Sequence, residues 1–331
     1  MVHTIQGKQV GNIGFGLMGL TWRPTPAPEE QAFAAIKAAI DAGCNYLNGG
    51  QFYGTPDHNS LTLLKKYYEK YPEDEAKVLL NIKGCADVVT IVPDTSFEGV
   101  KTSVETCVRL IGGNGRIHQF EPARKDKKVE IEDTVRALQA QVDAGNIGGI
   151  SLSEVSAATI RRAAKVAKIQ SVEVELSLWA TEPLENGVTA ACAELGIPIL
   201  AYSPLGRGML TGQIKSAEDI PEDDYRRTVP RFQPGAFEAN LRLVDEVKKL
   251  ADKKGVTPGQ IAIGWLLALG RRPGMPTIIP IPGATTPERV KENAVEIELS
   301  EEDINEIERI LSEFKPVGDR YNEYAMAMLD N

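Results

Sequence analysis

The stretch EEQAFAAIKAAIDAGCNYLN, residues 29–48, contains the unit that decides the fold. Its apolar residues recur at the three- and four-residue spacing of an amphipathic helix, and Gly43 stands where such a helix ends. The short run NYLN that follows is typical of a buried strand. The stretch therefore predicts a helix followed directly by a strand.

The same alternation of β-rich runs and helical segments extends from about residue 29 to 294. A second clear helix, EDTVRALQAQVDAG (132–145), also ends in glycine. The predicted strands are NIGFG (12–16), NYLN (45–48), VLLNI (78–82), IHQFE (117–121), IGGIS (147–151), SVEVE (171–175), PILAY (198–202) and TIIPI (277–281). Eight strands, each followed by a helix and with no internal linker, predict an α/β fold: one (β/α)8 TIM barrel domain over residues 1–331. We expect a long loop after the seventh strand, about 205–235, and a C-terminal helical tail.

Composition narrows the class of protein. The net charge of −9 and the lack of a basic stripe argue against a nucleic-acid partner. The longest apolar run, IAIGWLLALG, is about half of a membrane span, and MVHTIQGKQ at the start lacks the apolar core of a signal peptide. The four cysteines show no CxxC spacing, so we expect reduced thiols and no metal site. These features predict a cytoplasmic protein without membrane contact, and they do not indicate an oligomeric state.

The segment GFGLMG, Gly14–Gly19, fits the GxGxxG fingerprint of a dinucleotide-binding turn. In that turn the third glycine opens a helix, and an acidic residue follows about 20 positions later at a strand end. Here the three prolines of LTWRPTPAP (20–28) prevent a helix, and the nearest acid, Asp41, ends a helix instead. We therefore interpret these glycines as structural and expect any dinucleotide to bind elsewhere.

Two residues near predicted strand ends suggest chemistry, because the site of such a barrel lies at the C-terminal ends of its strands. Lys83 ends the run VLLNIK, where an ammonium would be buried unless it reaches solvent. Such a lysine can be a Schiff-base nucleophile, or a cation that lowers a neighbour's pKa. Tyr53 follows the preceding strand by five residues. Because tyrosine titrates near pH 10, an adjacent cation would make Tyr53 a useful general acid.

Five motifs in barrel order resemble those of the aldo-keto reductases, over nearly the whole chain. They are NGGQFYG (48–54), KG (83–84), SLSE (151–154), AYSPLGRGMLTG (201–212) and IPGATTPERVKENA (281–294). The wording of GLMGLTWRP (16–24) and NYLNGGQFYG (45–54) is most similar to the pyridoxal reductase branch of that superfamily.

The resemblance implies NADPH-dependent reduction of an aldehyde, with pyridoxal to pyridoxine as the favoured reaction. Tyr53 would be the general acid and Lys83 would lower its pKa, with Asn48 as the third catalytic residue. The implied substrate contacts are Trp22, Phe52 and Ala123.

The same resemblance implies the cofactor site. Tyr202 would stack on the nicotinamide, and Arg289, with Thr285, would hold the 2′-phosphate of NADPH. The other implied contacts are Ser153, Glu154 and Glu173 at the carboxamide, Ser203, Pro204 and Leu205 along the pyrophosphate, Glu292 and Asn293 at the adenine, and Met18, Gly208 and Gly283.

The chain departs from the family pattern at two catalytic positions. The family's lysine-neutralising Asp is Asn48, and its strand-four His is Ala123, which leaves room for a broad ring. His118 lies five residues earlier on the opposite strand face, so we expect it outside the site. Lacking a carboxylate at position 48, Lys83 could stay charged and act strongly on Tyr53, or could lose its proton.

The cofactor positions also differ, since Glu154 and Glu173 replace the usual Asn and Gln, and two acids there would repel each other. Alternatives to a pyridoxal reductase remain open at this point. They are a reductase of other aromatic aldehydes, a catalytically weak NADPH-binding regulatory subunit, and an aldolase that uses Lys83 as its nucleophile.

Overall fold

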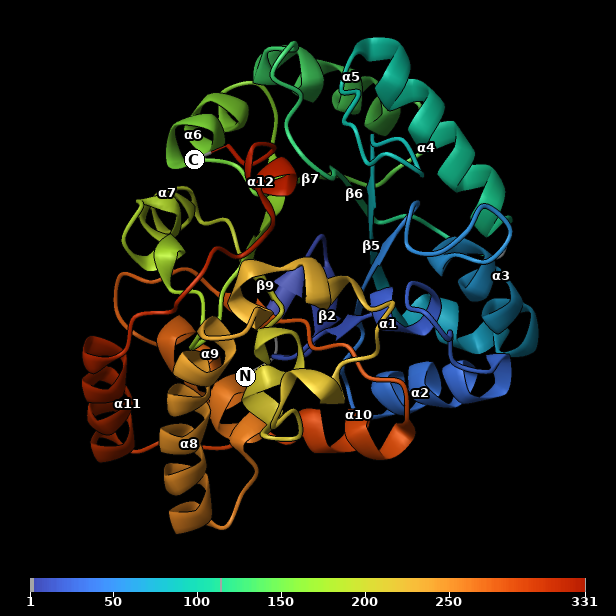
Figure 1. Ribbon diagram of the computed structural model, residues 1–331. Coiled ribbons are helices and arrows are strands. Elements are labelled where there is room, and N and C mark those ends of the chain that lie inside the picture. Colours follow the sequence, from blue (N-terminus) through green and yellow to red (C-terminus); the bar gives the residue numbers. More distant parts are fainter. Residues whose placement is uncertain (1–2, 114, 331) are drawn as a thin grey trace.

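The computed structural model describes residues 3–113 and 115–330, and its centre is a parallel β-barrel ringed by helices (Figure 1). The eight strands pair in chain order as β3 (Phe15–Gly16), β4 (Tyr46–Gly50), β5 (Leu79–Gly84), β6 (Gln119–Pro122), β7 (Ile150–Ser153), β8 (Ile169–Glu175), β9 (Ile199–Tyr202) and β10 (Ile278–Pro280). Every predicted strand is present, which confirms the (β/α)8 fold.

Helices cover the outside of the barrel. They are α1 (Met18–Thr21), α2 (Glu29–Asp41), α3 (Ser60–Lys70), α4 (Phe97–Ile111), α5 (Ile131–Asp143), α6 (Ala157–Ala164), α7 (Val188–Leu195), α8 (Ala236–Lys254), α9 (Pro258–Gly270), α10 (Pro287–Asn293), α11 (Glu301–Glu313) and α12 (Glu323–Met326). The two helices predicted most clearly, α2 and α5, are confirmed. Just beyond their ends Gly43 and Gly145 have φ of 81° and 77°, in the left-handed region that favours glycine.

The long loop and the helical tail are confirmed as well. Between β9 and α8 the chain forms only short 3₁₀ turns, all within the described part of the chain: η3 (Gly206–Thr211), η4 (Ala217–Asp219), η5 (Tyr225–Thr228) and η6 (Pro230–Phe232). Two further turns, η1 (Pro72–Lys77) and η2 (Glu182–Leu184), lie elsewhere. After α11 the chain returns to the barrel, where the short α12 lies near β7 (Figure 1).

The N-terminal end of the barrel is closed by a hairpin of β1 (His3–Ile5) and β2 (Lys8–Val10). Ile5 and Val10 pack in one buried cluster with Tyr46 and Leu79, which begin β4 and β5. The opposite, C-terminal end of the barrel is therefore the one left for a site.

Cys44, Cys85, Cys107 and Cys192 are buried free thiols. No helix among the described residues has both the length and the apolar character to cross a membrane. Within residues 3–113 and 115–330, no group of three or more His, Cys, Asp or Glu side chains is placed to hold a metal ion.

The glycines of GFGLMG close the barrel. Gly14 N donates to Pro280 O (2.9 Å), and Gly16 forms a parallel bridge with Gly283. A Cβ on Gly14 would lie 2.7 Å from Tyr46 O, much closer than Cβ atoms approach a backbone oxygen. The helix that begins within this segment, α1, has only four residues, unlike the long helix of a dinucleotide turn. The structural interpretation of these glycines agrees with this geometry.

We predict that Gly14→Ala lowers the free energy of unfolding by about 1–3 kcal/mol, because the new methyl group collides with Tyr46 O on β4 and with the Ile281 side chain after β10. Gly19→Ala is the matched control from the same segment, since a Cβ there meets only the Thr285 methyl group at 4.0 Å. Urea denaturation measures both. Equal stability of the two variants would contradict the role of Gly14 in closure.

Candidate active site

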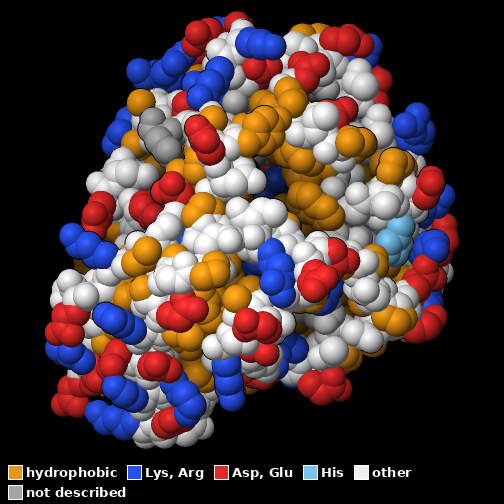
Figure 2. Space-filling view, viewed as in Figure 1, with side chains coloured by type: hydrophobic (Ala, Val, Ile, Leu, Met, Phe, Trp, Pro, Cys, Tyr) orange, Lys and Arg blue, Asp and Glu red, His pale blue; other side chains and the backbone are white. Residues whose placement is uncertain are grey.

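The C-terminal mouth of the barrel contains a small apolar cluster. Its buried members are Phe52, Tyr53 and Ala123, and its partly exposed members are Met18, Ala86, Val88 and Ile91. Figure 2 shows a hollow near the middle of one face of the molecule, with hydrophobic side chains gathered around it. The structure thus brings together the predicted acid and two predicted substrate contacts from segments that follow different strands.

Tyr53 is fixed from several sides. Its backbone carbonyl accepts a hydrogen bond from Thr21 Oγ1 (2.6 Å), and its ring stacks on Trp22 with centroids 5.5 Å apart. Phe52 packs edge-on against the same ring at 5.1 Å. A Cβ on Gly50 would lie 2.8 Å from the Tyr53 ring, so only glycine admits the ring here. The third predicted substrate contact, Trp22, is 42% exposed and so borders the site from the solvent side.

Lys83 lies in β5, with its ammonium inside the barrel and 4% of the residue exposed. Its Nζ is 3.3 Å from Tyr53 Oη, forms an ion pair with Glu173, and lies 3.6 Å from Glu121 Oε1. Burial lowers the pKa of Lys83, but the nearby Glu173, Tyr53 and Glu121 together outweigh burial and hold the pKa above its ordinary value, with Glu173 the largest contributor among them. Lys83 therefore has a carboxylate partner, which comes from Glu173 and not from residue 48.

Asn48 binds the carboxylate of the Lys83–Glu173 ion pair. Its Nδ2 donates to Glu173 Oε2 (2.6 Å), so the amide holds the carboxylate that Lys83 binds. An amide can do this and a carboxylate cannot, because only the amide has hydrogen to donate. Glu173, which the sequence predicted as a contact of the nicotinamide carboxamide, thus binds both Lys83 and Asn48.

Burial raises the pKa of Tyr53 above its ordinary value, while the charge of Lys83 opposes that rise. Glu173 adds to the rise because its charge weakens the effect of Lys83. The predicted lowering by Lys83 is therefore present but is not the net result in this structure. Tyr53 keeps its proton at neutral pH.

The C-terminal tail contributes residues that the sequence did not reveal. Arg320 pairs with Glu154 (2.9 Å) and Glu175 (3.0 Å), and Tyr321 Oη lies 2.7 Å from Tyr202 Oη. Burial raises the pKa of Glu154, but Arg320 and Arg124, with the hydrogen bonds from Arg320 and Glu175 N, together outweigh burial and lower the pKa below its ordinary value. The expected repulsion between Glu154 and Glu173 does not arise, since each acid has its own cation. No periodicity or motif in the tail could have indicated these contacts.

Glu121 is a second residue that was missed, although it was visible as an acid inside the buried run IHQFE. It is fully buried, and neither of its carboxylate oxygens has a hydrogen-bond partner among the described residues. Burial, followed by the nearby charge of Glu173, raises the pKa of Glu121 well above its ordinary value. His118, in contrast, immediately precedes β6 and accepts a hydrogen bond from Leu80 N, whereas Ala123 immediately follows the other end of β6.

The predicted cofactor residues lie on four neighbouring segments. Ser153 ends β7, Glu173 lies in β8, Tyr202 ends β9 and Arg289 belongs to α10. Glu292 and Asn293 also belong to α10, and Met18 begins α1. The others lie in the segments after β7, β9 and β10: Glu154, Ser203, Pro204, Leu205, Gly208, Gly283 and Thr285. Because neighbouring parallel strands end side by side, the structure brings most of these residues to one side of the barrel mouth.

Two of these residues have unsatisfied buried atoms. Ser153 Oγ and Asn293 Nδ2 find no hydrogen-bond partner within the described ranges. Buried polar atoms are nearly always paired, so each is a candidate contact for a bound molecule. Arg289 is half-buried and pairs with Glu292 on its own helix (2.8 Å). The residues present therefore fit a polar ligand that spans β7 to α10.

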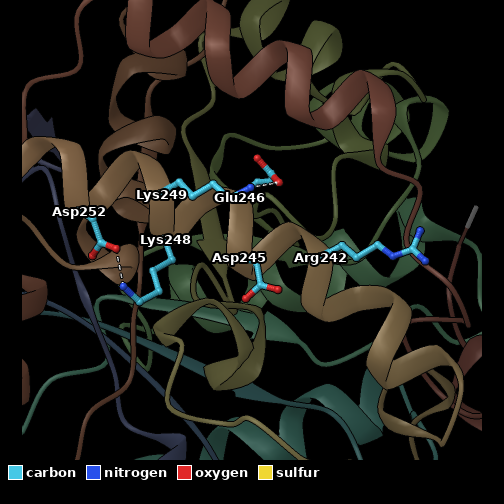
Figure 3. A pocket seen from close by; sticks show the side chains of 6 residues that line it. All are labelled: Arg242, Asp245, Glu246, Lys248, Lys249 and Asp252. Atoms are coloured by element: carbon cyan, nitrogen blue, oxygen red, sulfur yellow. Dashed lines mark hydrogen bonds and ion pairs between the residues drawn. The ribbon is translucent and has the colours of Figure 1, made fainter.

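A separate groove runs along α8 (Figure 3) and is lined by Arg242, Asp245, Glu246, Lys248, Lys249 and Asp252. Two of its lysines pair with acids on the same helix, Lys248 with Asp252 and Lys249 with Glu246. These are exposed pairs of both signs, typical of a solvated helix face. The groove includes none of the predicted site residues.

Comparison with known proteins defines the class. Residues 12–312 match the model of the aldo/keto reductase family. The chain is 41% identical over 326 residues to probable pyridoxal reductase 2 of Schizosaccharomyces pombe, covering 96% of this chain and 97% of that one. It is 35% identical to aldo-keto reductase yakc (NADP(+)) of the same yeast, covering 96% and 95%. The chain therefore belongs to the aldo/keto reductase family and is an oxidoreductase.

A solved structure supports the fold independently. The glycerol dehydrogenase AKR11B4 from Gluconobacter oxydans superposes with a TM-score of 0.81 at 22% identity, covering 96% of this chain and 97% of that one. This similarity shows that the two proteins share the same barrel fold.

We predict that Arg320→Gln lowers the free energy of unfolding at pH 7 by about 3 kcal/mol, because it leaves buried carboxylates without their cation. The folded pKa of Glu154 lies below its ordinary 4.5, so the pair stabilises the fold above that pH. As the pH falls through the folded pKa the stabilisation disappears, and the two proteins should converge. Urea titrations at pH 7 and at acid pH measure this, with the exposed Arg309→Gln as control. A difference that does not depend on pH would contradict the ion pair.

Proposed function

We propose that this protein reduces an aldehyde with hydride from NADPH, and that pyridoxal is its favoured substrate. One observation carries the proposal: Tyr53 Oη lies 3.3 Å from the Lys83 ammonium, beside an apolar cluster at the barrel mouth. A protonated phenol next to a fixed cation is suited to give its proton to a carbonyl oxygen.

NADPH, when bound, supplies the hydride that reaches the aldehyde carbon. Ser153 and Asn293 offer unpaired polar atoms to it, and Arg289 offers a guanidinium suited to the 2′-phosphate. The NADP(+) in the name of the similar yeast protein yakc supports the same choice.

The protein's own residues manage the proton. Tyr53 stays protonated at neutral pH, so it can donate to the carbonyl oxygen as negative charge develops there. The phenolate that results lies beside the Lys83 ammonium, which stabilises it. Trp22 and Phe52 shield the Tyr53 ring from water.

The substrate assignment rests on the site's shape and on similarity. Ala123 is buried in the apolar cluster beside Phe52, where a larger side chain would occupy space that an aromatic aldehyde needs. The similarity to a probable pyridoxal reductase favours pyridoxal among such aldehydes.

An aldolase mechanism is disfavoured by the same geometry. A Schiff base requires a neutral amine, whereas the Lys83 ammonium is paired with Glu173 and its pKa is raised. A regulatory subunit that binds NADPH without turnover is the outcome that the following experiment would reveal instead.

We predict that Tyr53→Phe lowers kcat for pyridoxal about 100-fold or more, because no other hydroxyl replaces the general acid. NADPH oxidation is followed at 340 nm, and NADPH affinity is measured by fluorescence titration. Affinity should stay near that of the wild type. Tyr71→Phe, at the end of α3 and outside the apolar cluster of the barrel mouth, is the control and should retain activity. Tight NADPH binding by the wild type without reduction of any aldehyde would overturn the proposed function.

We also predict that Arg289→Met weakens NADPH binding about 10- to 100-fold, because a charge-assisted contact to the 2′-phosphate is lost. NADH lacks that phosphate, so its affinity should not change, and it serves as the internal control. Fluorescence titration measures both cofactors. An equal loss for NADPH and NADH would show that Arg289 does not read the 2′-phosphate.

A further inference from the structure

We propose that Glu173 is the positioning residue that keeps the Lys83 ammonium charged and directed at Tyr53, the task for which residue 48 lacks a carboxylate. This inference rests on the proposed reductase function and adds to it a role for a residue on the far strand β8. The four side chains involved are Asn48, Lys83, Glu173 and Tyr53.

Two contacts of Glu173 and the burial of the ion pair carry the argument. Glu173 bonds directly to the Lys83 ammonium through Oε1, and its Oε2 accepts from Asn48 (2.6 Å). Lys83 and Glu173 are nearly inaccessible to water, with side chains 5% and 1% exposed. Both oxygens of Glu173 are therefore used, and the carboxylate cannot turn away from Lys83 without leaving a buried ammonium unpaired.

Asn48 follows from the same geometry. An aspartate at position 48 would place a second carboxylate within 2.6 Å of Glu173 Oε2, where the two charges repel. The amide removes that repulsion and adds a hydrogen bond. Asn48 and Glu173 together thus carry one negative charge. That charge lies on β8, whereas the family pattern places it on β4, at position 48.

Glu121 is the other acid near Lys83, but it lies farther from the ammonium than Glu173 does. Its nearest oxygen is 3.6 Å from Nζ, beyond hydrogen-bond distance, and both oxygens are unpaired among the described residues. An ionised carboxylate in that position would be buried without donors, which is strongly unfavourable. Glu121 is therefore the neutral acid of the pair, and Glu173 is the charged one.

The test exchanges the charge between the two strands. Glu173→Gln removes it, and the double variant Asn48→Asp/Glu173→Gln returns one carboxylate to the cluster with the hydrogen bond reversed. We expect kcat/KM of Glu173→Gln to fall on the order of 10- to 100-fold, and the double variant to recover to within about fivefold of the wild type. Glu246→Gln, the same acid-to-amide change on the solvated face of α8, is the matched control and should stay within about threefold of the wild type.

The pH profile separates positioning from a general loss of structure. Lys83 faces Glu173 on β8, Glu121 on β6, Tyr53 after β4 and the ring of Tyr202 on β9. Without Glu173 the ammonium loses its proton at lower pH, so the alkaline limb of kcat/KM should move down in Glu173→Gln and return in the double variant. A loss of activity with an unchanged limb would overturn the inference.

Thermal unfolding gives a second measurement that needs no turnover. The melting temperature should fall by about 5–10 °C in Glu173→Gln and recover in the double variant, because an unpaired buried ammonium destabilises the fold. If the wild type reduces no aldehyde, the proposed function fails while this series still tests the pair. If the wild type is active and Glu173→Gln equals it in activity and stability, only the present inference fails.

Discussion

A lysine ammonium buried inside a barrel needs an anion within a few ångströms, because the low-dielectric interior cannot solvate an isolated charge. In this protein that requirement is met across the barrel, between Lys83 on β5 and Glu173 on β8. The register of the strands sets this arrangement. Lys83 on β5 lies opposite Gly50 on β4 and opposite Glu121 on β6. The position of Tyr53 depends on the same ammonium, since its hydroxyl lies beside it.

A second polar layer lies below this one and is neutral. Gln119 Oε1 accepts hydrogen bonds from Tyr46 (2.5 Å), Ser151 (2.8 Å) and Ser171 (2.8 Å). Gln119 and Ser171 precede Glu121 and Glu173 by two residues, so each strand sends both of its polar residues to the interior. Below them the β1–β2 hairpin closes the barrel. Hydrogen bonds thus hold the closed end, and charges concentrate at the open end.

Most of the fold was predictable because the spacing of apolar residues within each segment indicates a strand or a helix locally. Tyr53 and Lys83 were predictable together because both follow or end neighbouring strands. Glu173 was recognised as unusual, but its partner lies 90 positions away in the chain, and local pattern cannot report such a contact. The pairing of Glu154 with Arg320 joins residues 166 positions apart, in a tail without a motif. Contacts of this kind are decided by the closure of the barrel and by where the tail crosses it.

The departures from the family pattern are best understood as exchanges between partners. Taken one at a time, Asn48 removes a charge, and Glu154 and Glu173 each add one. In the structure, Glu173 supplies the charge that Asn48 lacks, and Glu154 binds the guanidinium of Arg320. Tyr321, the next residue of the tail, meets Tyr202. The tail therefore contacts two of the residues expected at the nicotinamide. A substituted site in which Lys83 pairs with Glu173 and Arg320 pairs with Glu154 is consistent with an active enzyme, because the Lys83 ammonium keeps the charge that the proton donor requires.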